Sequence, residues 1–307
     1  MSTADQRPEI LRYTAFSTDP AGGNPAGVVL DATGLTDAEQ LAIAAELGYS
    51  ETAFLTAPPA ELPDQERAYT VRYFSPLAEV SFCGHATIAA AIAHAERHGP
   101  GNLQFVTPAG AVPVKVTCAA DGTLQATLTS VEPAVHKVAE DDVDEALRAL
   151  GWFRADLDPE FPPRIGYAGA RHLILAVRTR ARLADLAYDF ARLKDFMTDL
   201  DLTTIQLVWR ESATVFHVRD PFPVGGVVED PATGAAAAAF GAYARELGLV
   251  PEESVLLLHQ GADMGRPGEL RVELYAGDPR IRVTGTGARI PDPGTTRAAA
   301  RHHGRTV

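Results

Sequence analysis

Residues 84–91 read Gly-His-Ala-Thr-Ile-Ala-Ala-Ala, and residues 230–237 read Asp-Pro-Ala-Thr-Gly-Ala-Ala-Ala. Each stretch opens an alanine-rich segment of helical character, and their threonines lie 146 positions apart. The same offset relates Val28 to Ile174, which stand in two other similar stretches. Alanine after threonine is by itself a common helix start, but one offset shared by two separate pairs favours two copies of one supersecondary unit.

The duplication predicts how the 307 residues divide. A chain of this length can form two domains of about 150 residues each. We expect an N-terminal lobe over residues 8–132, completed by a last strand near 281–292, and a C-terminal lobe over residues 133–290. Residues 297–307 form a basic tail that we expect to be disordered.

The composition excludes several classes of protein. The N-terminus is polar and no apolar segment is long enough to span a membrane. The net charge of -13 argues against nucleic acid, which requires a concentrated basic surface. Two cysteines, Cys83 and Cys118, form no disulfide framework, so a cytoplasmic location is expected.

The hydrophobic pattern predicts an α+β fold. Each half contains many short strands and one or two helices, for example a helix that begins with a capping box at Thr36 and Glu39 and ends at Gly48. Residues 235–240 are apolar on all sides, which predicts a helix buried inside a curved sheet or barrel. Together with the duplication, the pattern predicts two related lobes, each with many strands around one or two helices.

The starts of the two alanine-rich helices are candidate binding sites. Small residues there leave the first backbone N–H groups accessible, and these groups together with the helix dipole favour an anion. Two such ends facing one cleft would hold the carboxylate of an amino-acid-like or benzoate-like ligand. The residues placed at these starts are Gly84, Ala86, Thr87, Thr233, Gly234 and Ala235.

Three residues near these starts allow a structural and a functional interpretation. Asp230 precedes Pro231, which is the pattern of a helix N-cap, yet it also lies at the expected ligand site. His85 is either a structural histidine or a catalytic one. Strand alternation places Glu51 on the apolar face of Ala53, unless it is a strand-end residue exposed to water. Desolvation raises a carboxyl pKa toward the range useful for proton transfer.

The positions of the cysteines indicate whether the protein could use a thiol-based racemase mechanism. Cys83 directly precedes a predicted helix start, where a thiolate is stabilised. The offset of 146 leads from Cys83 to position 229, but Glu229 and Asp230 stand there, so a two-thiol racemase lacks its second cysteine. The histidines near Cys83 do not have a convincing metal-ligand spacing, and no metal site is predicted.

The motifs together resemble the phenazine-biosynthesis PhzF-like family, and they run in that family's order over roughly residues 10–290. The family has the diaminopimelate epimerase fold, so the resemblance implies two pseudo-symmetric lobes, each a curved, mostly antiparallel sheet or barrel around a central helix. The matching stretches are Gly23-Asn24-Pro25-Ala26-Gly27-Val28-Val29, Ser50-Glu51-Thr52-Ala53-Phe54, Phe82-Cys83-Gly84-His85-Ala86-Thr87, Glu229-Asp230-Pro231-Ala232-Thr233-Gly234 and Gly265-Arg266-Pro267.

The resemblance implies a set of site residues. Glu51 matches the family's glutamate that shuttles a proton between substrate carbons without a cofactor, and His85 and Asp230 match its two partners. Asn24 is expected among the substrate-binding residues. Where the family commonly has serine after Asp-Pro-x-Thr-Gly, this chain has Ala235, which removes a hydroxyl available to the substrate carboxylate.

We therefore predict a cofactor-independent isomerase that moves a proton and a double bond on a small carboxylate-bearing substrate. Its catalytic residues would be Glu51, His85 and Asp230, and a cytoplasmic homodimer is expected. A racemase or epimerase that uses the single thiol of Cys83 is the first alternative. A small-molecule-binding protein without catalysis is the second.

Overall fold

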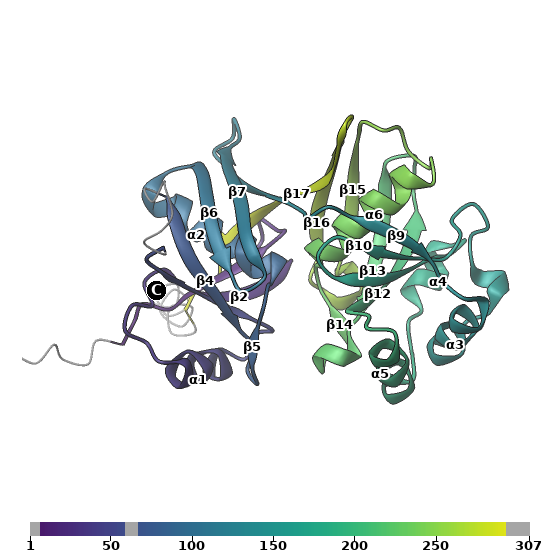
Figure 1. Cartoon of the computed structure of the whole chain (residues 1–307), viewed down its shortest axis with the longest axis horizontal. Coiled ribbons are helices and arrows are strands. Elements are labelled where there is room, and N and C mark those ends of the chain that lie inside the picture. Colours follow the sequence, from purple (N-terminus) through teal and green to yellow (C-terminus); the bar gives the residue numbers. More distant parts are fainter. Residues whose placement is uncertain (1–6, 59–66, 293–307) are drawn as a thin grey trace, which may run out of the picture. The chain divides into compact units, whose positions relative to one another are not determined.

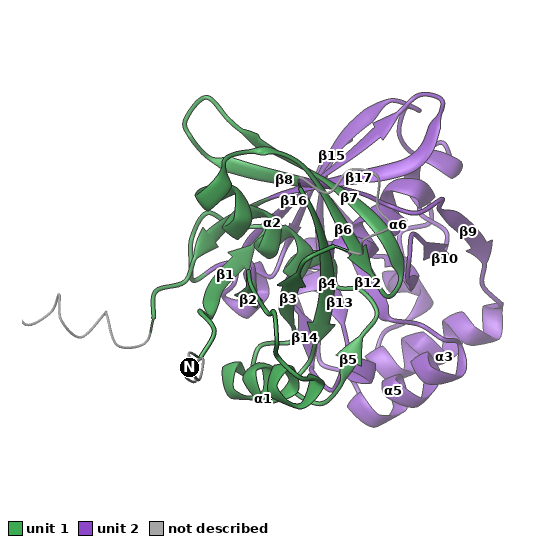
Figure 2. Ribbon diagram, turned by 60° about the vertical axis from the view of Figure 1, so that its left-hand side comes forward, with its two compact units in different colours: residues 1–21, 25–126, 286–307 green, residues 22–24, 127–285 purple. Residues whose placement is uncertain are grey.

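The computed structural model describes residues 7–58 and 67–292. The chain forms two compact units, coloured separately in Figure 2. Unit 1 comprises residues 1–21, 25–126 and 286–307, and unit 2 comprises residues 22–24 and 127–285. The chain thus passes into unit 2 after residue 126 and returns to unit 1 within its last strand. The predicted basic tail at 297–307 lies outside the described residues.

Unit 1 contains the first helices and strands of the chain. The helices are α1 (Asp37–Leu47) and α2 (Gly84–His98). The strands are β1 (Leu11–Ala15), β2 (Asn24–Val29), β3 (Thr52–Thr56), β4 (Ala68–Phe74), β5 (Glu79–Val80), β6 (Gly101–Thr107), β7 (Gly110–Cys118) and β8 (Leu124–Thr129). The C-terminal part of β17 (Asp278–Arg289) completes the unit by pairing with β1.

The strands of unit 1 curve around α2 (Figure 1). Pairing runs in the order β17, β1, β2, β3, β4, β6, β7, with β2–β3 and β4–β6 parallel and β3–β4 and β6–β7 antiparallel. α2 packs against β1, β3 and β7, and every residue from His85 to Ala95 is buried. This helix is therefore central, and its small alanine side chains allow strands to approach it closely on all sides.

Unit 2 contains the remaining elements. Its helices are α3 (Glu140–Leu150), α4 (Arg180–Ala184), α5 (Phe190–Asp199) and α6 (Gly234–Glu246), with short 3-10 turns at 154–156, 223–225 and 262–264. Its strands are β9 (Ala134–Lys137), β10 (Arg164–Tyr167), β11 (Arg171–Ala176), β12 (Thr204–Arg210), β13 (Val215–Pro221), β14 (Glu229–Asp230), β15 (Ser254–Gln260), β16 (Gly268–Tyr275) and most of β17.

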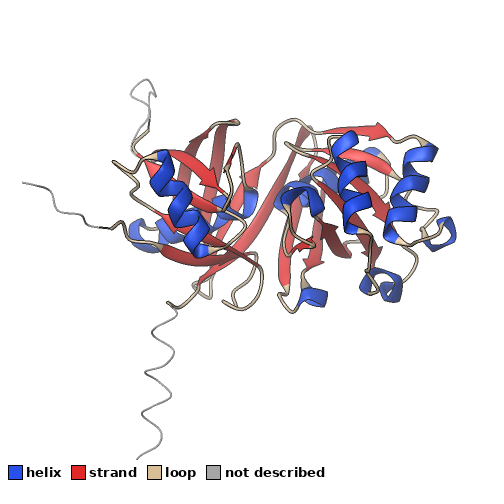
Figure 3. Ribbon diagram, turned by 90° about the horizontal axis from the view of Figure 1, so that it is seen from below, coloured by secondary structure: helices blue, strands red, loops and turns tan. Residues whose placement is uncertain are grey.

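Unit 2 also has a curved sheet around one helix, with additional helices outside it. Pairing runs in the order β9, β10, β11, β12, β13, β15, β16, β17, with β11–β12 and β13–β15 parallel. α6 packs against β9, β10, β11 and β16 and is almost entirely buried. α3 and α5, among the blue helices of Figure 3, share a second apolar cluster with β11 and β12.

The two units repeat one strand order, which confirms the predicted duplication. The series β1, β2, β3, β4, β6, β7 corresponds to β10, β11, β12, β13, β15, β16, and the parallel pairs stand at the same two places in both series. A two-residue strand precedes the central helix in each case, β5 against β4 and β14 against β13. The chain is therefore an α+β protein with two copies of one architecture.

The offset of 146 is wrong at the central helices. The first helical hydrogen bond of α2 joins the Thr87 N–H to the Cys83 carbonyl, and that of α6 joins the Ala237 N–H to the Thr233 carbonyl. Cys83 therefore corresponds to Thr233 as the N-cap, and Thr87 does not correspond to Thr233. Alanine runs match one another in several registers, which is why the threonines align in sequence without being equivalent.

Two sequence predictions of local structure are confirmed. The Thr36 side chain accepts a hydrogen bond from the Glu39 N–H, the Glu39 side chain caps Thr36 in return, and Gly48 ends α1 in the left-handed region.

No helix in the described ranges, 7–58 and 67–292, is both long and apolar enough to cross a membrane.

Candidate functional site

In unit 1, Glu51, Cys83 and His85 form a compact cluster of ionisable side chains. The Cys83 Sγ lies 3.5 Å from the Glu51 Oε2 and 3.3 Å from the His85 Nδ1. The His85 Nε2 lies 3.4 Å from the same Glu51 oxygen and 3.2 Å from the Ser50 Oγ. The Glu51 side chain is 14% exposed and that of His85 is 7% exposed. A carboxylate, a thiol and an imidazole thus share one largely buried location that solvent still reaches.

Local structure explains how these side chains meet. Glu51 directly precedes β3, and Cys83 and His85 flank the first residue of α2. Cys83 is the N-cap residue, but its thiol makes no capping hydrogen bond and contacts Glu51 and His85 instead. The contact of α2 with β3 therefore brings the thiol and the imidazole to the glutamate.

Thr87, expected at the ligand site, forms its hydrogen bonds inside the protein. Its hydroxyl donates to the Cys83 carbonyl at 2.6 Å and contacts the Tyr73 hydroxyl at 2.6 Å, and the residue is fully buried. Burial raises the pKa of Tyr73, so its hydroxyl stays protonated. The side chain of Thr87 thus stabilises the first turn of α2, while Gly84 is partly exposed and Ala86 is buried.

In unit 2, the structure corrects the interpretation of Asp230 as a helix N-cap. α6 begins at Gly234 with Thr233 as the N-cap residue, whereas Asp230 belongs to β14. The Asp230 carboxylate accepts hydrogen bonds from the Asn24 Nδ2 at 2.8 Å and from the Thr233 Oγ1 at 2.6 Å. The three expected residues Asn24, Asp230 and Thr233 therefore lie together in unit 2.

Gln260, which sequence reasoning missed, fixes the segment between β14 and α6. Its Nε2 donates to the Asp230 carbonyl at 2.8 Å and to the Thr233 Oγ1 at 2.9 Å, and its Oε1 accepts from the Thr233 N–H at 2.9 Å. The next residue, Gly261, has φ +80°, and a Cβ there would overlap the Arg266 carbonyl oxygen. The chain thus requires glycine directly after the glutamine.

The first turns of α2 and α6 have the electrostatics of anion sites. Neither contains an acidic residue, and the N–H groups before Thr87 and Ala237 precede the first helical hydrogen bond. At α6, Gly234 is buried and Ala235 is partly exposed. A methyl group stands at 235 instead of a hydroxyl, so the backbone N–H groups are the donors that this helix start offers to a ligand.

A buried network of hydrogen-bonded polar side chains lies next to Asp230 in the sheet, and sequence reasoning did not predict it. The His172 Nδ1 lies 2.8 Å from the Thr204 Oγ1, and that hydroxyl donates to the Asp220 Oδ1 at 2.7 Å. Asp220 pairs with Asp230 across β13 and β14. His172, Thr204 and Asp220 are each at most 1% exposed. The sheet thus connects Asp230 to a polar network that solvent does not reach.

Burial sets the charges of this network. Burial raises the pKa of Asp220 well above its usual value, and the charges of Asp230 and Glu229 raise it further, against the hydrogen bond from Thr204, which lowers it. Burial lowers the pKa of His172 to about 3, so the imidazole is neutral. Burial therefore favours the uncharged forms of both Asp220 and His172.

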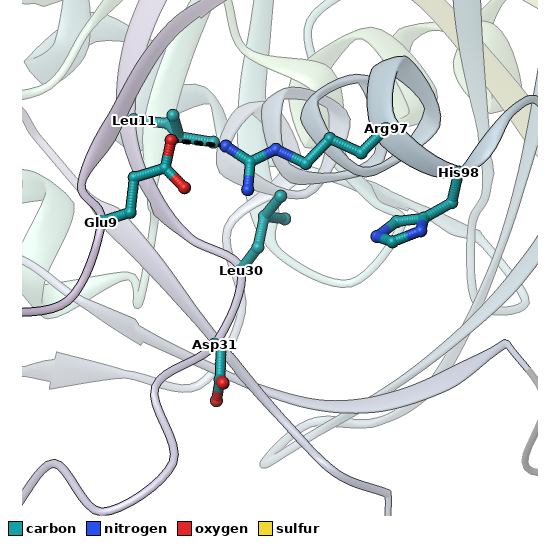
Figure 4. A pocket seen from close by; sticks show the side chains of 6 residues that line it. All are labelled: Glu9, Leu11, Leu30, Asp31, Arg97 and His98. Carbon is teal, nitrogen blue, oxygen red and sulfur yellow. Dashed lines mark hydrogen bonds and ion pairs between the residues drawn. The ribbon is translucent and has the colours of Figure 1, made fainter. Parts of the chain in front are cut away.

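One pocket in unit 1 lies apart from the expected residues. Figure 4 shows its lining, and its volume is about 200 Å³. The guanidinium of Arg97 lies there, but it is already 2.6 Å from the Glu9 carboxylate. The charge that could attract a carboxylate ligand is therefore compensated. The lining residues are Glu9, Leu11, Leu30, Asp31, Arg97 and His98.

The expected catalytic residues divide between the units. Glu51 and His85 contact each other in unit 1, and Asp230 contacts Asn24 in unit 2.

Among the described residues, one group of side chains could hold a metal ion. It consists of Glu51, Cys83 and His85, whose ligand atoms all lie within 4.8 Å of one another. Sequence spacing does not indicate this group, because Glu51 is distant from the other two along the chain.

Comparisons of the sequence and of the structure with known proteins identify the same family. A family model described as Phenazine biosynthesis-like protein matches residues 13–292. Uncharacterized isomerase YfhB of Bacillus subtilis (strain 168) is 30% identical over 289 residues, which cover 92% of this chain and 96% of that protein. The crystal structure of the Bacillus anthracis phenazine biosynthesis protein, PhzF family, matches with a TM-score of 0.81 at 26% identity, covering 92% of this chain and 96% of that one.

For one further relative, the name states the reaction that it catalyses. Trans-2,3-dihydro-3-hydroxyanthranilate isomerase of Pseudomonas aeruginosa is 27% identical over 277 residues, which cover 89% of this chain and 94% of that protein. These matches extend over both units, so the similarity concerns the whole architecture and not one repeat.

Proposed function

Because the chain belongs to the phenazine biosynthesis-like protein family, whose curated relatives are named isomerases, we propose that it is a cofactor-independent isomerase of a small carboxylate-bearing substrate. The reaction would move a proton, and with it a double bond, within the substrate. The observation that carries the proposal is the Glu51 carboxylate, which lies largely buried within 3.5 Å of both an imidazole and a thiol.

Glu51 is the proposed acid and base. It would take a proton from one substrate carbon and return it to another, so that the substrate's composition does not change. The exposed 14% of its side chain leaves the carboxylate accessible to a substrate.

His85 is the proposed partner of Glu51. Its Nε2 lies 3.4 Å from the carboxylate and 3.2 Å from the Ser50 hydroxyl, so it can position the glutamate or donate to the substrate. Asp230, held by Asn24 and Thr233, is the proposed third catalytic group.

The helix starts are the proposed carboxylate-binding groups. The N–H groups at Gly84 and Ala86 in α2 and at Gly234 and Ala235 in α6 would donate to the substrate. The backbone supplies these donors whichever side chain stands at 235. The named substrate of the Pseudomonas relative is one candidate, but Ala235 lacks the hydroxyl expected from the family pattern.

A racemase or epimerase is the second candidate. The observation in its favour is the Cys83 thiol, which lies 3.3 Å from an imidazole nitrogen that could remove its proton. Inversion also needs an acid on the opposite face of the substrate carbon, whereas the Glu51 Oε2 lies 3.5 Å from the Cys83 Sγ and is therefore on the same side as the thiol. In unit 2 the residue that corresponds to Cys83 as the N-cap of the central helix is Thr233, so that position offers no second thiol.

Proton exchange in deuterated water tests the proposal. Dihydroanthranilates, unsaturated amino acids and proline-like amino acids are incubated with the wild-type enzyme, and NMR follows where deuterium enters. An isomerase incorporates deuterium at the carbon that gains the proton and shifts the double bond. Deuterium at a stereocentre with no bond shift would support the epimerase, and binding without exchange would support the non-catalytic protein.

The assembly and compartment are part of the same proposal. We expect a homodimer, which sedimentation equilibrium tests directly. A cytoplasmic location agrees with Cys83 and Cys118, neither of which is in a disulfide.

A further inference from the structure

The cluster of Glu51, Cys83 and His85 also has the donor set of a zinc site. Zn²⁺ binds thiolate, imidazole and carboxylate ligands, whereas Mg²⁺ and Ca²⁺ prefer oxygen ligands alone. Cys83 contributes a sulfur, His85 a nitrogen and Glu51 an oxygen, and these three atoms lie within 4.8 Å of one another. The donor chemistry therefore selects a borderline-soft transition metal ion.

The distances between the donor atoms fit a tetrahedral ion. Zn–S bonds of about 2.3 Å and Zn–N and Zn–O bonds of about 2.0–2.1 Å require separations of roughly 3.5 Å from the sulfur to the other ligands and roughly 3.3 Å between nitrogen and oxygen. The Cys83 Sγ lies 3.5 Å from the Glu51 Oε2 and 3.8 Å from the His85 Nε2. That nitrogen lies 3.4 Å from the same oxygen.

We propose that Glu51, Cys83 and His85 bind one Zn²⁺ ion, and that the bound ion inhibits the enzyme. Binding replaces the Cys83 S–H bond with an S–Zn bond and releases the proton to solvent. The inhibition rests on the proposed function of Glu51, because a carboxylate that coordinates the ion no longer accepts a substrate proton. The binding itself does not depend on that function.

Charge and burial favour the ion at this location. A thiolate and a carboxylate together neutralise a divalent cation, and the thiolate would lie at the N-terminus of α2, whose dipole stabilises negative charge. The His85 side chain is 7% exposed and that of Glu51 is 14% exposed, so the ligands are held in place without being sealed from solvent. Three protein ligands leave one tetrahedral position for water.

The first measurement is metal binding by the full-length protein. The protein is stripped with a chelator, and Zn²⁺ is titrated by calorimetry and by competition with a chromophoric chelator. Co²⁺ replaces Zn²⁺ in a parallel titration, because thiolate coordination then gives a charge-transfer absorption band. We expect one ion per chain, release of a proton and a thiolate band.

Matched variants assign the ligands. Mutating a residue that only hydrogen-bonds to a metal ligand typically weakens metal affinity about 10- to 100-fold. Removing a ligand should cost at least as much, so Cys83→Ser should weaken Zn²⁺ binding by that factor or more and remove the charge-transfer band. Glu51→Gln should weaken binding but keep the band. Cys118→Ser removes the other thiol, which is exposed, and should change neither. A variant lacking His302 and His303 tests binding by the terminal histidines.

The outcomes separate this inference from the proposed function. Wild-type protein that binds no Zn²⁺ tightly enough to compete with the chelator overturns the zinc site, whether or not the enzyme turns over a substrate. Binding that survives Cys83→Ser but is lost without His302 and His303 overturns it as well. Binding at the cluster without loss of turnover overturns the inhibition. Inhibition that requires much more Zn²⁺ in Cys83→Ser than in Cys118→Ser supports both parts.

Discussion

Asp220→Asn should change how the stability of unit 2 depends on pH. In the folded protein the Asp220 carboxyl is fully buried, and burial raises its pKa well above the usual value of 3.8. In the unfolded chain it ionises normally. A raised folded pKa gives stability that is fully present below the unfolded pKa and is lost as pH rises through the folded pKa. Asparagine does not titrate, so the variant lacks this loss.

The magnitude follows from the proton linkage. Between the unfolded and the folded pKa, wild-type protein should lose about 1.4 kcal/mol of unfolding free energy per pH unit relative to Asp220→Asn. The amide keeps an oxygen for the Thr204 hydroxyl, and any unsatisfied N–H would cost about 1–3 kcal/mol at every pH. The slope of the difference, not its absolute value, is therefore the quantity to measure.

Tryptophan fluorescence during urea unfolding provides the assay. Both tryptophans, Trp152 and Trp209, belong to unit 2, as does Asp220. Wild type and Asp220→Asn are unfolded at a series of pH values from about 5 to about 8. A difference in unfolding free energy that stays constant across this range would refute the assignment of a protonated, buried carboxyl.

Two further predictions concern the same unit. His172 has its pKa lowered to about 3 by burial, so the fold should lose about 1.4 kcal/mol per pH unit as pH falls below about 6.5, and His172→Asn should remove that loss in acid urea unfolding. Gly261→Ala should lower the urea midpoint and disturb the segment before α6, because φ is +80° and the added Cβ would overlap the Arg266 carbonyl oxygen; an unchanged midpoint would contradict this.

Local sequence patterns correctly predict those parts of the fold that depend only on interactions between neighbouring residues. The capping box at Thr36 and Glu39 sets the start of α1, and Gly48 sets its end, because each requires only neighbouring residues. Helix α6 is predictable as buried because residues 235–240 are apolar on all sides. The duplication is also correct, although its offset is wrong at the central helices, because alanine runs carry little information about register.

The candidate site is predictable only in part. The motifs around Glu51 and His85 are recognisable separately, and the packing of α2 against β3 brings them together. Asp230 has the pattern of a cap because Pro231 follows it, but Gln260, from a distant strand, holds that segment extended before Thr233. A local pattern contains no information about such a distant hydrogen-bond partner.

The polar network behind Asp230 shows the same limit. His172, Thr204 and Asp220 come from three different strands, and the register of β11 with β12 and of β13 with β14 places them. Each would be an ordinary polar residue in its own strand. Only the sheet pairing makes them one buried network, and no spacing in the sequence indicates it.

The rate of Glu51→Gln relative to Cys83→Ala, on the first substrate found to exchange deuterium, tests the central claim most directly. The amide keeps the shape of the carboxylate but cannot accept a substrate proton and return it, and general acid–base groups typically contribute about 10²- to 10⁴-fold. We predict a loss of that order in turnover for Glu51→Gln with ligand binding largely retained, and most activity in Cys83→Ala. An active Glu51→Gln enzyme beside a folded but inactive Cys83→Ala enzyme would contradict the account and assign the chemistry to the thiol.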